Sequence, residues 1–190
     1  MSKVRVEVGA VGTSTNKTDY YYLFEIREGK LEKNAQENVE RFDIGLFSED
    51  TTKTLYITQK GECSSLYEPN LEVVRQHSKA AEKRFTPIST KQVQVRRMDS
   101  ILPADLIIDY LKIDTQGSEL DVLKGAGDLL YNVRTVECEV EFVELYKGQP
   151  LFEDIKEYLN QYGLVFDRYR REVRWESRVR VFGDAIFKRV

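Results

Sequence analysis

Short apolar stretches alternate with charged, helix-prone stretches along most of the chain. Residues 4–8 alternate valine with charged residues, and residues 20–24 are a tyrosine-rich apolar run, so both stretches predict strands. Residues 28–40 are dominated by helix formers and predict a helix, after which residues 41–47 return to a strand pattern.

The middle of the chain is less regular. Residues 52–58 and 91–98 alternate like strands, residues 61–70 have the composition of a turn, and residues 71–84 predict a helix. We expect residues from about 48 to 98 to form an irregular insertion beside the main sheet.

The C-terminal half carries the clearest pattern. Residues 106–114 are almost continuously apolar, which is typical of a strand covered on both faces. Further along, the periodicity predicts helices over 117–131 and 151–159, a strand over 133–142, and an antiparallel strand pair over 164–171 and 179–190.

This order of elements predicts an α/β fold in a single domain spanning residues 1–190. The central sheet should be mostly parallel, with helices on both faces and a C-terminal antiparallel strand pair. Ligands of such sheets bind beyond the carboxyl ends of the strands.

Composition and charge narrow the classes of function. The chain has 190 residues, of which 41% are hydrophobic and 32% charged, and no apolar run is long enough for a membrane helix. The N-terminal segment has no signal-peptide pattern, so we expect a cytoplasmic protein without a membrane partner. The net charge of −3 disfavours nucleic acid as a partner.

The spacing of cysteine and histidine predicts no metal site. Cys63 and Cys138 lie far apart without a paired-ligand motif, and we expect two free thiols. His77 is the only histidine and lies in a charged helical stretch, where a solvated side chain is the simpler interpretation.

Two strand ends near the N-terminus could hold a ligand. Glu7 is followed by a turn that contains Gly9 and Gly12, where backbone amides can approach an anion closely, although a glycine turn without a ligand has the same pattern. Glu25 ends the next strand, where a carboxylate can accept both hydroxyl groups of a ribose. Together they suggest an adenosine-bearing cofactor.

The third strand end is the most specific. Asp114 ends the apolar strand beside a glycine turn, and a carboxylate there is costly to desolvate unless it binds a ligand or accepts hydrogen bonds. Glu119 follows in the first turn of the next helix, where it is either a second functional carboxylate or a residue stabilised by the helix dipole.

The motif LKIDTQGSELDVLKGA, followed by VECEVEF and by ELYKGQPLFEDIKEYLNQYGL, resembles FkbM-type methyltransferases, and the resemblance extends from about residue 44 onward. It implies a Rossmann-like methyltransferase fold and S-adenosylmethionine as the cofactor. The implied reaction is O-methylation of a hydroxyl group on a sugar, glycan or natural product, so the partner would be a small-molecule or glycan hydroxyl acceptor.

The resemblance also assigns roles to individual residues. Glu7, Gly9, Gly12 and Glu25 would bind the cofactor. Asp114 would lie near the methionine part of the cofactor or the acceptor and is the best candidate base, with Glu119 as the second catalytic candidate. Residues on the acceptor side would be Ser65, Glu139 and Tyr146.

Two alternatives stay open at this point. Residues 13–19 leave too little chain for the helix that normally follows the first glycine motif, so the protein could be a non-catalytic binding or scaffold protein of the same fold with a degenerate cofactor site. The arginine-rich tail, in which Tyr169 and Trp175 are interleaved with arginines, could instead bind single-stranded nucleic acid or an anionic acceptor. An exposed strand pair gives the same pattern.

Overall fold

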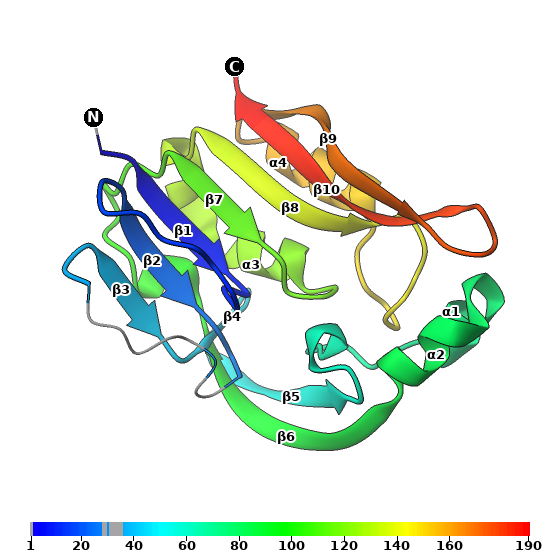
Figure 1. The fold of residues 1–190 in the computed structure, drawn as a ribbon. Helices are drawn as coiled ribbons and strands as arrows, with labels where there is room; N and C mark the ends of the chain where they lie inside the picture. The colour runs from blue at the N-terminus through cyan, green and yellow to red at the C-terminus, as the bar shows by residue number, and fades with distance from the viewer. Residues whose placement is uncertain (1, 28–29, 31–35) are drawn as a thin grey trace.

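A seven-stranded sheet forms the centre of the molecule (Figure 1). The computed structural model describes residues 2–27, 30 and 36–190. The strand order is β3-β2-β1-β7-β8-β10-β9. The first five strands in this order are parallel to one another, β10 is antiparallel to β8, and β9 is antiparallel to β10. The strands are β1 (Val4–Val8), β2 (Tyr20–Phe24), β3 (Val39–Phe42), β7 (Tyr110–Ile113), β8 (Thr135–Glu141), β9 (Leu164–Arg174) and β10 (Arg180–Arg189). The predicted α/β fold, with a mostly parallel sheet and a C-terminal antiparallel pair, is confirmed.

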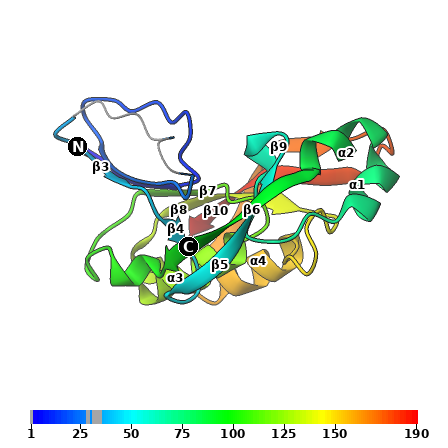
Figure 2. The ribbon, with the colours of Figure 1, turned by 90° about the horizontal axis from the view of Figure 1, so that it is seen from below.

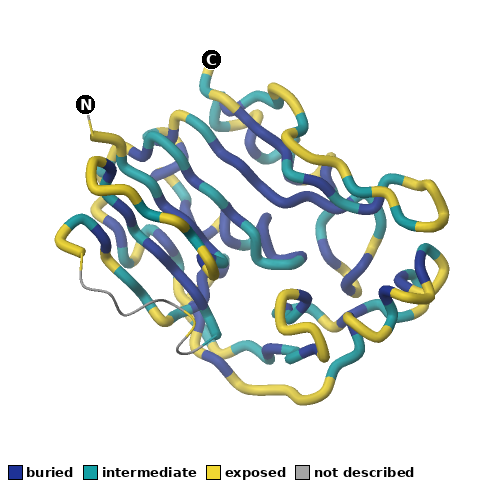
Figure 3. The backbone as a smooth tube through the Cα atoms, in the orientation of Figure 1, coloured by how far each residue is buried: buried dark blue, intermediate teal, exposed yellow. Residues whose placement is uncertain are grey.

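Two helices cover one face of this sheet (Figure 2). They are α3 (Glu119–Ala126) and α4 (Phe152–Asn160), and their apolar sides pack with the alternate strand residues that point toward them, such as Val6, Ile113 and Cys138. This packing forms the main core. In Figure 3 the buried residues run along the middle strands, whereas β6 (Pro87–Arg96) is largely exposed.

The opposite face differs from the prediction, because the described residues place no helix on it. Residues 9–19 join β1 to the parallel strand β2 without a helix. The helix expected over 28–40 falls mostly outside the described residues, and Val39 already belongs to β3. This face carries polar pairs such as Arg5 with Asp19 at 3.0 Å and a small apolar cluster of Ala10, Tyr21, Leu23 and Val39. The β1–β2 connection is too short for a helix, as the length of residues 13–19 predicted.

A second, three-stranded sheet lies beyond the carboxyl ends of β1, β2 and β7 (Figure 1). It consists of β4 (Gly45–Leu46), β6 and β5 (Thr51–Thr58), in the order β4-β6-β5. The loop after β5 contains the short 3-10 helix η1 (Gly61–Cys63).

Some elements break where the sequence predicted continuity. The helix expected over 71–84 is two helices, α1 (Leu71–His77) and α2 (Lys79–Phe85), because Ser78 is extended and its hydroxyl accepts from the Ala81 amide to cap α2. The expected helix over 117–131 changes at Gly127, where φ is +51°, into a 3-10 helix over Gly127–Asn132.

The turn after β1 fits tightly against the end of β7. Gly9 has φ +78°, and a β-carbon there would lie 1.9 Å from the carbonyl oxygen of Asp114. Gly12, in the same turn, has φ +75° but has no atom within 4 Å of such a β-carbon. Both positions favour glycine for their backbone conformation, and Gly9 requires it for space as well.

This difference predicts unequal costs for alanine. Gly12→Ala should lower the free energy of unfolding by about 1 kcal/mol, the cost of a left-handed alanine. Gly9→Ala should lower it by roughly 1–3 kcal/mol more, because the β1 turn must move away from Asp114. Urea denaturation of both variants measures the difference, and equal losses would contradict the close contact.

Candidate functional site

A cavity of about 410 Å³ lies between the carboxyl ends of β1, β2 and β7 and the second sheet. Among its lining residues are five that the sequence singled out: Gly9, Glu25, Ser65, Asp114 and Glu139. They come from segments far apart in the chain, and the parallel register that pairs Val8 with Phe24 and with Ile113 aligns three of these strand ends. The predicted clustering of strand ends therefore produces one cavity.

Glu7, on β1, and Gly12, in the turn after it, do not line the cavity. The Glu7 carboxylate accepts a 2.6 Å hydrogen bond from the Thr13 hydroxyl, which ties the turn back onto β1. Glu7 thus shapes the position of Gly9 and offers no lone pair directly to the cavity.

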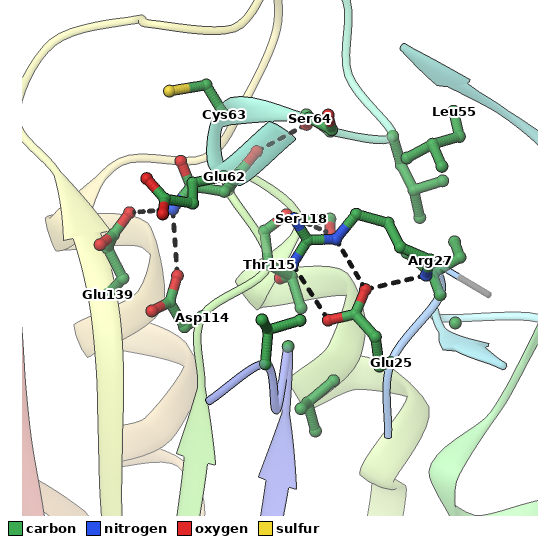
Figure 4. Close-up of a pocket in the computed structure, with 18 of the residues that line it drawn as sticks. Glu25, Arg27, Leu55, Glu62, Cys63, Ser64, Asp114, Thr115, Ser118 and Glu139 are labelled. Atoms are coloured by element: carbon green, nitrogen blue, oxygen red, sulfur yellow. Dashed lines mark hydrogen bonds and ion pairs between the residues drawn. The ribbon is translucent and has the colours of Figure 1, made fainter. Parts of the chain in front are cut away.

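Glu25 is buried and already engaged by Arg27 (Figure 4). Its Oε1 accepts from the backbone amide and Nε of Arg27 at 2.8 and 2.9 Å, and its Oε2 accepts from Nη2 at 3.2 Å. The Arg27 Nη1 donates to the carbonyl of Gly61 at 2.8 Å and so links β2 to the loop of the second sheet. Oε2 can still accept a hydrogen bond from one hydroxyl. Binding of both ribose hydroxyl groups by the two carboxylate oxygens requires Arg27 to release one of its hydrogen bonds to Glu25.

On the other side of the cavity, Gln116 joins the carboxyl groups of Asp114 and Glu139, which lie near each other in Figure 4. Its Nε2 donates to Asp114 Oδ1 at 3.0 Å and to Glu139 Oε1 at 2.6 Å. Asp114 comes from the end of β7 and Glu139 from β8, so this amide bridges adjacent strands. The sequence pointed to both carboxylates but not to the amide between them.

Ser65 and Tyr146 converge on the same glutamine from outside the main sheet. The Ser65 hydroxyl donates to the Gln116 carbonyl at 2.6 Å, and the Tyr146 hydroxyl lies 3.1 Å from both Gln116 Oε1 and the Cys63 carbonyl. Tyr146 is fully buried and does not line the cavity. Both residues hold the turn after β7 in place.

Glu119, a catalytic candidate from the sequence, does not reach the cavity lining. Its carboxylate accepts from the amide and hydroxyl of Thr115 at 2.7 and 3.1 Å and from the amide of Gly117 at 2.9 Å. Glu119 therefore closes the turn at the start of α3, which is the structural alternative considered for this position. Burial raises its pKa to about 7, against the opposing hydrogen bonds.

Two further glutamates lie close to this turn on β8. Burial, then the charges of Asp114 and Glu119, raises the pKa of Glu139 well above its ordinary value. Burial and the charges of Glu119, Glu139 and Asp114 do the same to Glu141. Neither carboxyl oxygen of Glu141 accepts a hydrogen bond within 3.5 Å. The site thus concentrates carboxyl groups in a poorly solvated place.

Sequence reasoning did not identify the aromatic wall at the Glu139 end. Trp175 packs edge-on against Phe85 and Phe182, with ring centroids 5.8 and 6.2 Å apart, and all three residues line the cavity. Arg171 lies beside them, with Nε 3.2 Å from Asp184 and Nη2 3.8 Å from Glu139. The only signal in the sequence was the arginine-rich tail with its aromatics.

Three further tail arginines form ion pairs on the strand surface. Arg170 lies 2.9 Å from Glu137, Arg180 lies 2.5 Å from Glu172, and Arg168 pairs with Asp167. These contacts reduce the positive charge that the tail could offer to phosphates.

The cysteines, possible metal ligands and helices of the described residues complete the description. Cys63 and Cys138 are free and buried, as expected. Over residues 2–27, 30 and 36–190, no cluster of three or more His, Cys, Asp or Glu side chains is placed to hold a metal ion. In the same part of the chain, none of the helices has the length and apolar character needed to cross a membrane.

The isolated Glu141 carboxyl predicts a pH-dependent stability effect. A raised carboxyl pKa means that the folded protein keeps a proton that the unfolded chain releases above about pH 4.5, so this group's contribution to stability is lost as pH rises. Glu141→Gln should therefore gain stability relative to the unmodified protein between pH 5 and 8, by up to about 1.4 kcal/mol per pH unit.

Urea denaturation at pH 5, 6, 7 and 8 measures this change. Glu157→Gln, at an exposed position on α4, is the matched control and should run parallel to the unmodified protein. Parallel curves for Glu141→Gln as well would contradict the raised pKa.

The fold has counterparts among solved structures. The crystal structure of methyltransferase FkbM from Methylobacillus flagellatus KT matches 98% of this chain at 15% sequence identity with a TM-score of 0.58. The chain spans 43% of that protein's length. Magnesium protoporphyrin IX methyltransferase from Synechocystis PCC 6803, solved with bound SAM, matches the whole chain at 13% identity with a TM-score of 0.46, and the match covers 70% of that chain. No curated protein matches this sequence.

The sequence also matches a protein family. The model of the methyltransferase FkbM domain aligns with residues 10–166, which is most of the chain and includes Glu25, Asp114, Glu119, Glu139 and Tyr146. Together with the fold and the cavity at the strand ends, this match shows that the chain belongs to the FkbM methyltransferase domain family.

Proposed function

We propose that this protein transfers a methyl group from S-adenosylmethionine to a hydroxyl group of a small molecule or glycan. The observation that carries the proposal is the cavity in which Gly9, Glu25 and Asp114 meet at three adjacent strand ends. Family membership supports methyl transfer in general, and the cavity supplies candidates for both the cofactor and the acceptor.

Two features of the cavity near Gly9 and Glu25 suit an adenosine. Gly9 lines the cavity, and its backbone belongs to a turn that is held by the hydrogen bond between Glu7 and Thr13. Glu25 keeps one oxygen with acceptor capacity for a ribose hydroxyl. When bound, S-adenosylmethionine supplies an electrophilic methyl group on a positively charged sulfur.

Asp114 is the group best placed to act on an acceptor hydroxyl. Its carboxylate lines the cavity, forms no ion pair with the described residues, and receives a hydrogen bond from Gln116 at Oδ1. Asp114 can therefore accept the proton of the hydroxyl as the oxygen attacks. Most of the rate gain would come from the orientation of the acceptor by the cavity walls.

The acceptor end would be formed by the aromatic wall of Phe85, Trp175 and Phe182 beside Glu139. Flat aromatic side chains pack against the faces of sugars and other ring compounds and do not select a particular arrangement of polar groups on the ring. This arrangement agrees with an acceptor that presents its hydroxyl toward Asp114 with a ring against Trp175.

Calorimetry tests the cofactor. We expect S-adenosylmethionine and S-adenosylhomocysteine to bind saturably with micromolar Kd values, and Glu25→Gln to weaken both about tenfold, because the ribose is common to the two ligands. Glu157→Gln serves as the control for charge. Absence of binding by the folded protein would favour a scaffold protein with a degenerate cofactor site.

A transfer assay tests Asp114. The unmodified protein is incubated with tritiated-methyl S-adenosylmethionine and a panel of sugar and phenolic hydroxyl compounds to find an acceptor. Asp114→Asn should then reduce transfer at least about a hundredfold while retaining S-adenosylhomocysteine binding, because the amide cannot take the proton. Undiminished transfer would remove Asp114 from the mechanism.

A further inference from the structure

Three arginine side chains from the described part of the chain line the cavity, and two of them are paired. The Arg27 Nε lies 2.9 Å from a carboxylate oxygen of Glu25, and the Arg171 Nε lies 3.2 Å from one of Asp184. Arg84, in the last turn of α2, forms no ion pair with any carboxyl group that the structure describes. Its guanidinium is therefore the lining cation that keeps its charge available for a ligand.

Two carboxylates close to Arg84 in the chain or in the lining are engaged with other cations. Glu82, in the same helix, pairs with Arg75 at 2.5 Å. Glu62, which lines the cavity, pairs with Lys60 at 3.6 Å. Neither ion pair involves Arg84, so a ligand that reaches its guanidinium does not have to displace a carboxylate.

Glu139 adds little negative charge at this end of the cavity. Burial, and then the charge of Asp114, raises the pKa of Glu139 well above its ordinary value. Its carboxyl group therefore keeps its proton to a higher pH than an exposed glutamate does. The wall near Phe85 and Trp175 is accordingly more positive than a count of its acidic and basic residues suggests.

Arg84 is directed toward the aromatic wall and is not merely a residue that suits a helix end. Lys83 occupies the same last turn, where the helix dipole favours a cation, but only Arg84 lines the cavity. Burial raises the pKa of the Cys63 thiol, and the charge of Arg84 opposes that rise, which shows that the guanidinium lies close to this buried group. The next residue, Phe85, packs against Trp175 with ring centroids 5.8 Å apart.

The helix that carries Arg84 is fastened to the hairpin that carries Trp175. At the start of α2 the Ser78 hydroxyl donates to Glu176 at 2.9 Å, and the His77 Nδ1 lies 2.9 Å from the Ser177 hydroxyl. The Ser177 amide also donates to the His77 carbonyl at 3.2 Å. Figure 1 shows α2 beside this end of β9 and β10. These contacts fix the guanidinium and the aromatic wall relative to each other.

We propose that Arg84 determines the specificity for the acceptor by binding an acidic group on it, a carboxylate or a phosphate. The inference rests on the proposed function and names the class of its acceptor: a ring compound that carries both a hydroxyl and an acidic group. A guanidinium can donate two parallel hydrogen bonds to either acid. With the ring against Trp175, the acidic group meets Arg84 while the hydroxyl faces Asp114.

Trp175 supplies a direct probe, because it is the only tryptophan in the chain and it lines the cavity. Its fluorescence is titrated, without cofactor, with glucuronate and its neutral amide, and with glucose 6-phosphate and glucose. The acidic member of at least one pair should bind about tenfold more tightly than its neutral partner, and the pair that shows the preference distinguishes a carboxylate from a phosphate. The preference should shrink in 0.5 M salt, which screens the charge.

Three variants assign the preference to Arg84. Arg84→Gln should bind acidic and neutral probes alike while its affinity for the neutral probes stays unchanged. Arg84→Lys keeps the charge without the two-pronged geometry and should keep part of the preference. Lys83→Gln removes a charge from the same helical turn at an exposed position outside the lining, and it should behave like the unmodified protein.

The outcomes separate this inference from the proposed function. Equal affinities for the acidic and neutral probes, no binding of any probe, or a preference that persists in Arg84→Gln would each overturn the role of Arg84. Saturable binding of S-adenosylmethionine alongside any of these results would leave methyl transfer standing. Failure of the folded protein to bind S-adenosylmethionine would overturn the proposed function and, with it, the acceptor.

Discussion

The close approach of the β1 turn to the end of β7 is the constraint on which the site depends. The Asp114 amide donates to the Val8 carbonyl at 3.0 Å, and Gly9 lies against the Asp114 carbonyl without room for a β-carbon. This contact fixes where β7 ends and where its turn begins. The positions of Asp114, Gln116 and Glu119 relative to the glycine turn follow from it.

Electrostatics then distinguishes carboxyl groups that are close in space. Glu119 receives three hydrogen bonds from one turn and serves the backbone, whereas Asp114 receives a side-chain amide and keeps an oxygen toward the cavity. Glu141 has no hydrogen-bond partner within 3.5 Å and lies outside the lining. Similar chemical groups take different roles because their donors differ.

The sequence predicted the strand ends well because parallel strands bring their carboxyl ends to one edge of the sheet. Glu25 and Asp114 follow from that rule and from local pattern alone. The sequence could not show that Arg27 would engage Glu25, that Glu119 would turn inward, or that Trp175 would join the cavity wall. Those facts depend on side-chain direction and on contacts between distant segments.

The polar face of the central sheet has a consequence for sequence variation. On β1, Val6 packs in the main core while its neighbour Arg5 pairs with Asp19 on the other side. Replacing a core-facing residue leaves a cavity, whereas a residue on the polar face can exchange one solvated side chain for another. Tolerance to substitution should therefore be greater at Arg5 than at Val6, and related chains could diverge wherever the opposite face is solvated while the core face stays nearly fixed.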